Sequence, residues 1–136
     1  MATSPRKVLI VDDEPDVLRY VQAVLEDDGY QFFTASDGKA ALHSACAQLP
    51  DLIVLDVQMP VMDGFQTFYE LRRDERTKSI PVIMLTGVGR RTGVRFDEKT
   101  MGEYLGSEPE AYIEKPIDQQ RLLETVRRLI GCEPKP

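Results

Sequence analysis

Cysteine, histidine and excess basic charge are scarce in this sequence, and each scarcity excludes a class of protein. The 136 residues include two cysteines and one histidine. Cys46 and Cys132 lie far apart in the chain, so neither a disulfide framework nor a cysteine pair for a metal is indicated. The formal net charge is −6, which argues against direct binding of nucleic acid or of an anionic membrane. We therefore expect a protein of the reducing cytoplasm, with no membrane partner and no direct nucleic-acid partner.

Long apolar runs and repeats are also missing. The N-terminal apolar run is short and ends in two aspartates, which is not the pattern of a secretory signal. His43 falls within a helical pattern, away from the ends of the predicted strands, so we expect it to be a surface or boundary residue. The length suits one domain spanning 1–136, with a core at about 7–131 and a frayed tail at 132–136. We expect no second folded domain, unless the chain is a piece of a longer protein.

Short runs of branched aliphatic residues alternate with helical patterns. The runs at 8–11, 52–55, 82–85 and 111–113 are continuous rather than alternating, which is typical of strands buried on both faces. A weaker run at 31–35 predicts a further strand. Four stripes with helical spacing lie between or after these runs, near 17–25, 41–49, 65–69 and 122–130. This order predicts an α/β fold, a doubly wound, five-stranded parallel sheet with helices on both faces.

One segment departs from the alternation. Residues 87–110 contain five glycines and no sustained apolar period, so we expect an irregular, extended connection between the fourth and fifth strands. Its Arg90, Arg91 and Arg95 suggest the hypothesis that it carries a partner or dimer surface. The alternative is a solvated insertion without a binding role. Retention of all partner binding after deletion of 89–106 would end the hypothesis.

Polar residues close the predicted strands. The first strand ends in Asp12 and Asp13, the third in Asp56, the fourth in Thr86, and the fifth is followed by Lys115. Ligands of open parallel sheets bind beyond the carboxyl ends of the strands, so these side chains should meet. One aspartate alone is usually a turn or cap residue, but capping does not explain the whole set. Hard oxygen ligands favour Mg²⁺, beside which Asp56 can act as a nucleophile towards phosphorus.

The segments VLIVDDEP, LIVLDVQMPVMDG, VIMLT and AYIEKP resemble, in order and spacing, the signature blocks of bacterial response-regulator receiver domains, the family of CheY-like single-domain proteins. The similarity runs from about Lys7 to Gly131. It implies a flavodoxin-like (βα)5 fold and a phosphorelay function in a two-component system. A sensor histidine kinase or phosphotransfer protein would supply the phosphoryl group, and phosphorylation would switch binding to a downstream protein. The segment 87–110 is longer than is usual in that family.

The resemblance also assigns roles to single residues. It makes Asp56 the phosphoacceptor, Asp13 a direct magnesium ligand and Asp12 the residue that holds metal-bound water, with the backbone carbonyl of Gln58 completing the set. It makes Thr86 the hydroxyl residue that moves towards the phosphoryl group, and Lys115 the lysine that contacts it. The remaining implied features are a cis peptide bond at Lys115–Pro116 and an aromatic switch at Tyr112, whose alternative role is simple packing of a strand aromatic.

Two other functions fit parts of the pattern. A magnesium-dependent phosphatase of the haloacid-dehalogenase-like type would need a second acidic residue two positions after the nucleophile, where this chain has Gln58. A receiver-like scaffold that is never phosphorylated would be expected to lack acidic or lysine positions that are present here. We therefore expect a signalling protein whose only catalysis is its own phosphorylation and dephosphorylation.

Overall fold

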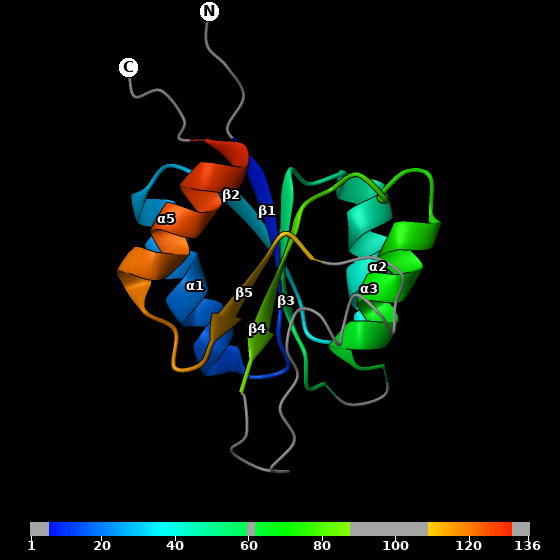
Figure 1. Cartoon of the computed structure of the whole chain (residues 1–136), viewed down its shortest axis with the longest axis horizontal. Helices are drawn as coiled ribbons and strands as arrows, with labels where there is room; N and C mark the ends of the chain where they lie inside the picture. The colour runs from blue at the N-terminus through cyan, green and yellow to red at the C-terminus, as the bar shows by residue number, and fades with distance from the viewer. Residues whose placement is uncertain (1–5, 60–61, 88–108, 132–136) are drawn as a thin grey trace, which may run out of the picture.

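The computed structural model describes residues 6–59, 62–87 and 109–131, which form a parallel sheet between two layers of helices (Figure 1). The five strands pair in the order β2-β1-β3-β4-β5. This is the flavodoxin-like arrangement, so the predicted fold class is confirmed. The strands are β1 (Lys7–Val11), β2 (Gln31–Ala35), β3 (Leu52–Asp56), β4 (Val82–Thr86) and β5 (Ala111–Glu114).

The helices cover the sheet in pairs. Figure 1 shows α1 and α5 on one face and α2 and α3 on the other. Each face has its own apolar cluster, one centred on residues such as Val21 and Leu122 and the other on residues such as Phe68 and Leu71. The described helices are α1 (Pro15–Asp27), α2 (Gly38–Gln48), α3 (Gly64–Arg73) and α5 (Gln119–Ile130).

The central strands have the continuous apolar sequence that their position requires. Every residue of β3 and β4 is buried, and so are Val8 to Val11 of β1. A strand covered by helices on both faces has no solvent side, so alternation of polar and apolar residues disappears. β2, at one edge of the sheet, is only partly buried, which explains why its run is the weakest in the sequence.

Side-chain caps and glycines set the helix boundaries. The carboxylate of Asp63 accepts a hydrogen bond from the backbone N–H of Gln66 at 2.9 Å, and Asp118 does the same for Arg121. Such caps satisfy N–H groups that have no partner inside the helix. Gly29 and Gly131, which follow α1 and α5, have positive φ angles of 88° and 77°. The two glycines thus mark the points at which the chain turns away from these helices.

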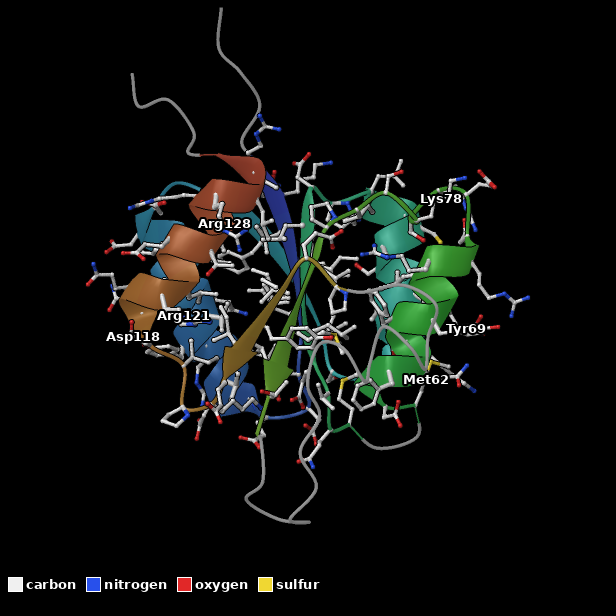
Figure 2. The ribbon with its side chains drawn as sticks, in the orientation of Figure 1. Met62, Tyr69, Lys78, Asp118, Arg121 and Arg128 are labelled. Carbon is white, nitrogen blue, oxygen red and sulfur yellow. The ribbon has the colours of Figure 1, made fainter. Side chains whose placement is uncertain are left out.

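Each of two apolar stripes includes a residue that the structure leaves exposed. Leu49 is not part of the buried face of α2, because it caps the helix in the left-handed conformation with φ 48° and is 53% exposed. Tyr69 of α3 is 40% exposed and projects outward in Figure 2. The Arg73 guanidinium lies over its ring, 5.2 Å from the ring centroid. In both cases helical spacing placed a residue near the buried side, but the end of the helix or its rotation on the sheet left the side chain in water.

The segment between β4 and β5 is held at its far end by Glu110. The Glu110 side chain accepts hydrogen bonds from Val82 N–H and Arg72, both at 2.8 Å, so it fastens the start of β5 to β4 and α3. The predicted irregular connection lies mostly at 88–108, outside the described residues, as do Arg90, Arg91, Arg95 and the tail at 132–136. Within the described part of the chain, no helix has both the length and the apolar character needed to cross a membrane.

Candidate functional site: a carboxylate and lysine cluster

The polar residues predicted to meet do meet, at the edge formed by the carboxyl ends of the strands. This edge is the lower end of the sheet in Figure 1. Asp12 follows β1, Asp56 is the last residue of β3, Thr86 is the last of β4, and Lys115 follows β5. β1 lies directly beside β3, and β3 beside β4, so three of these strands place their final residues next to one another.

Three carboxylates form the centre of the site. Each of Asp12, Asp13 and Asp56 offers an oxygen atom, and these atoms all lie within 4.8 Å of one another. Asp12 is fully buried and Asp56 is 3% exposed, whereas Asp13 is exposed. Like charges at this spacing repel by several kcal/mol at an effective dielectric constant of about 20. The cluster is therefore stable as three anions only if cations lie against it.

Lys115 supplies one of these cations. Its ammonium Nζ lies 3.0 Å from Asp12 Oδ2 and 3.1 Å from Asp56 Oδ1, so one side chain pairs with two carboxylates. The backbone N–H of Lys115 donates a 2.7 Å hydrogen bond to the carbonyl of Thr86, which fixes the start of the Lys115 side chain beside β4. The Lys115–Pro116 peptide bond is cis, as the resemblance to receiver domains implies.

Burial and mutual repulsion perturb the ionisation of the cluster. Burial is the main cause that raises the pKa of Asp56 to about 6, and the charge of Asp12 raises it further against the opposing effect of Lys115. Burial likewise raises the pKa of Asp12, although the N–H of Glu14 and the Lys115 ammonium oppose it. For Lys115, burial works to lower the pKa, but the hydrogen bond to Asp12 and the charges of Asp56 and Asp12 outweigh it and raise the pKa. One lysine thus does not compensate the buried acids fully.

A pocket of about 480 Å³ opens beside the cluster. Asp13, Asp56 and Lys115 line it together with Gln58, whose side chain is exposed. Its lining also includes the less polar side chains of Tyr20 and Ile117. The Tyr20 hydroxyl donates a 3.1 Å hydrogen bond to the carbonyl of Ile117, which joins α1 to the loop after β5. The pocket therefore gives a ligand direct access to Asp56.

The two predicted switch residues lie on neighbouring strands. Thr86 is 6% exposed and ends β4, one residue after the position that pairs with Asp56. Tyr112 lies opposite Met84 in the β4–β5 pairing and is partly buried against the apolar cluster under α2 and α3. Both positions suit the predicted roles, and the movement itself stays a prediction.

Sequence reasoning missed two contributors to the site. The backbone N–H of Glu14 donates a 2.9 Å hydrogen bond to Asp12 Oδ1 and so orients the buried carboxylate. Gly64, the first residue of α3, lies against the backbone of Asp56. The sequence did hold a clue to Gly64, because glycine is an unusual choice for the first turn of a helix, directly after the capping Asp63. His43, by contrast, is exposed, and the structure confirms its predicted surface position.

Comparison with known proteins identifies the family. The model of the response regulator receiver domain matches residues 8–127. The chain belongs to this family. Receiver domains are signalling domains of two-component response regulators, and phosphorylation of an aspartate is their general mechanism. The family membership inferred from the sequence is thus confirmed.

Among its relatives, this chain matches nearly the whole length of one protein and about half the length of another. The chain is 33% identical to the protein PilH of Pseudomonas aeruginosa over 92% of its own length and 98% of PilH. It is 40% identical to the DNA-binding dual master transcriptional regulator RpaA of Synechocystis over 91% of its own length. That match spans only 48% of RpaA, so the chain covers about half of this relative. The prediction of no direct nucleic-acid partner stays a prediction.

A solved structure provides a counterpart for the site. The receiver domain of a Pseudomonas aeruginosa sensor histidine kinase, solved with a magnesium ion coordinated in its active site cleft, matches with a TM-score of 0.79. The two chains are 28% identical, and the match covers 94% of this chain and 99% of the other. In this protein Asp12, Asp13 and Asp56 offer only oxygen ligands, the donor set that suits a hard divalent cation. The cluster can hold a metal ion.

Proposed function

We propose that this chain is a receiver domain, spanning 1–136 with a core at about 7–131, in which Asp56 accepts a phosphoryl group in a Mg²⁺-dependent reaction. The donor is a phosphohistidine of a sensor kinase or a phosphotransfer protein, and the phosphorylated form binds a downstream protein in the cytoplasm. The observation that supports this most strongly is the position of Asp56, which lies 3.1 Å from the Lys115 ammonium and beside two further carboxylates.

The carboxylates and one carbonyl oxygen suit Mg²⁺. We assign Asp13, Asp56 and the backbone carbonyl of Gln58 as ligands and Asp12 as the holder of metal-bound water. When bound, the ion neutralises the carboxylates and the oxygens of the transferring phosphoryl group. The pKa of Asp56, about 6 in the metal-free protein, leaves most of this carboxyl ionised at pH 7. Asp56 is therefore in the nucleophilic form at neutral pH.

Phosphoryl transfer to Asp56 needs no further acid from this chain. An oxygen of Asp56 forms a bond to phosphorus while the bond from phosphorus to the donor imidazole nitrogen breaks, and the departing imidazole takes up a proton from water. The Lys115 ammonium, placed beside Asp56 Oδ1, stabilises the negative oxygens of the transferring group. Gln58, two residues after Asp56, has no carboxyl group to protonate an alkoxide leaving group, so turnover of ordinary phosphomonoesters is not expected.

The added charge provides the switch. Phosphorylation places about 1.5 to 2 negative charges on Asp56 at pH 7. These charges favour the conformer in which Thr86 donates a hydrogen bond to the phosphoryl oxygens while Lys115 stays paired with them. Movement of Thr86 frees space beside β4 into which the Tyr112 ring turns. The surface that binds the downstream protein then changes shape with the positions of the Thr86 and Tyr112 side chains.

Intact-mass spectrometry after incubation with acetyl phosphate and Mg²⁺ tests the proposal. We expect the native chain to gain the mass of one phosphoryl group and Asp56→Asn to gain none. Asp27→Asn is the matched control, because Asp27 is an exposed aspartate at the end of α1, and it should react like the native chain. No gain in mass on the native chain would indicate a scaffold, and rapid hydrolysis of unrelated phosphomonoesters would indicate a phosphatase.

A further inference from the structure

The first residue of α3, Gly64, packs directly against the backbone of Asp56 and Val57, which carries the proposed phosphoacceptor. Gly64 is buried, and its N–H donates a 2.8 Å hydrogen bond to the carbonyl of Val57, the residue after Asp56. A Cβ atom added to Gly64 would lie 2.7 Å from Val57 Cα and 2.9 Å from the carbonyl carbon of Asp56, and it would come closer still to the Asp56 carbonyl oxygen. Real Cβ atoms essentially never come within 3.0 Å of such neighbours.

Glycine is required at position 64 because there is no room for a Cβ atom, and not because of an unusual backbone angle. Among the described residues the glycines with positive φ are Gly29 and Gly131, not Gly64. The atoms in the way belong to the backbone, which cannot rotate aside as a side chain can. Any side chain at position 64 must therefore move either α3 or the end of β3.

The end of β3 is held from two sides. The Val57 N–H donates a 3.0 Å hydrogen bond to the carbonyl of Leu85 in β4, and the Val57 carbonyl accepts the bond from Gly64. Val57 lies between Asp56, which carries the nucleophilic carboxylate, and Gln58, whose carbonyl we assign to the metal. A shift at Val57 thus moves both groups at once.

We propose that Gly64 is a positioning residue for the phosphorylation site. Its missing side chain lets the first turn of α3 pack against Asp56 and Val57 and so fixes the two oxygen donors that flank Val57. This inference rests on the proposed function, since it assumes that Asp56 and the Gln58 carbonyl act together on Mg²⁺. Groups that orient metal ligands from behind typically change metal affinity by about 10- to 100-fold when they are altered.

Gly38 offers a matched control. It is the first residue of α2, is buried, and a Cβ atom there would also be crowded, 2.8 Å from Met62 Cγ and Sδ and closer to Thr67 Oγ1. The three nearest atoms are side-chain atoms of Thr67 in α3 and of Met62 in the loop before it, not backbone atoms of Asp56 or Val57. Met62 lies at the start of α3 in Figure 2. Gly38→Ala therefore adds crowding at the start of a helix, against side chains that can rotate aside, and leaves the backbone of the site untouched.

The experiment compares Gly64→Ala, Gly38→Ala and the native chain in three measurements. They are the free energy of unfolding without metal, the Mg²⁺ dissociation constant by calorimetry, and the rate of phosphorylation by acetyl phosphate at saturating Mg²⁺. We expect Gly64→Ala to bind Mg²⁺ at least about tenfold more weakly and to react more slowly even at saturation, because both donors are displaced. We expect Gly38→Ala to keep native Mg²⁺ affinity in its folded fraction.

Two outcomes separate this inference from the proposed function. Equal Mg²⁺ affinity in Gly64→Ala and the native chain overturns the inference, since α3 would then have moved instead of β3. Failure of the native chain to be phosphorylated overturns the proposed function whatever the glycine variants do. If Gly64→Ala does not fold in buffer, the same titrations are made in sucrose, which favours the compact state. Native Mg²⁺ affinity under those conditions is again the contradicting result.

Discussion

Replacing Asp56 by asparagine should stabilise the metal-free protein, although it removes the proposed phosphoacceptor. The side chain of Asp56 is buried, and its pKa rises from the ordinary 3.8 to about 6. One pKa unit corresponds to about 1.4 kcal/mol, so ionisation of Asp56 at pH 7 costs the folded state up to about 3 kcal/mol relative to the unfolded chain. Asn has nearly the same shape and no charge. We therefore expect a gain of about 2 kcal/mol in the free energy of unfolding.

The free energy of unfolding should also depend on pH, and the direction of that dependence follows from the raised pKa of Asp56. A carboxyl group whose pKa is higher in the folded state binds protons more tightly there, so the metal-free native protein should become more stable as the pH falls from about 7 to about 4. Asp12, whose pKa is also raised, contributes in the same direction. In Asp56→Asn the dependence should be weaker, because the contribution of Asp56 is lost while that of Asp12 remains.

Urea denaturation in the presence of a chelator, at pH 5 and pH 7, measures both quantities. Added Mg²⁺ should reverse the order of stability, because a ligand at 100 times its dissociation constant stabilises the native state by about 2.7 kcal/mol. The native chain has the full set of ligands and Asp56→Asn does not. A metal-free Asp56→Asn variant that is less stable than the native chain at pH 7 would refute the reasoning about repulsion in the cluster.

Three further predictions follow from other contacts. Lys115→Met should lower the metal-free free energy of unfolding by about 2 kcal/mol at pH 7 and by less at pH 5, where protonation relieves the unpaired acids, as urea denaturation at both pH values will show. Leu49→Gly should raise thermal stability by about 0.5 to 1 kcal/mol, because the exposed Leu49 holds a left-handed angle that glycine adopts without strain, and calorimetry measures the gain. Thr86→Ala should still accept a phosphoryl group from acetyl phosphate, but NMR spectra of the phosphorylated variant should lack the shift of the Tyr112 ring resonances seen in the native chain.

The strands of the sheet were predictable because the central ones are unbroken runs of apolar residues. A strand covered on both faces must be apolar at every position, so β3 and β4 stand out without reference to the rest of the chain. The strand order does not follow from such runs alone. The rule that short crossovers are right-handed predicts a parallel sheet with helices on both faces, and the strand order was implied only by the resemblance to the receiver family.

The site was predictable because the fold brings the ends of parallel strands to one edge. Asp12, Asp56 and Lys115 are distant in sequence, yet each closes or directly follows a strand, and that position decides their proximity. What the sequence did not reveal depends on close contacts between backbones. The crowding at Gly64 becomes visible only when α3 is placed against β3, and the exposure of Leu49 and Tyr69 depends on where a helix stops and how it rotates.

The most direct test of the central claim is to locate the phosphoryl group chemically. The native chain is incubated with acetyl phosphate and Mg²⁺, the acyl phosphate is reduced with borohydride, and the resulting homoserine is mapped by peptide mass spectrometry. Homoserine at position 56, dependent on Mg²⁺, is the result that we predict. Homoserine at Asp12 or Asp13 instead, or labelling of Asp56 that is unaffected by a chelator, would contradict the account.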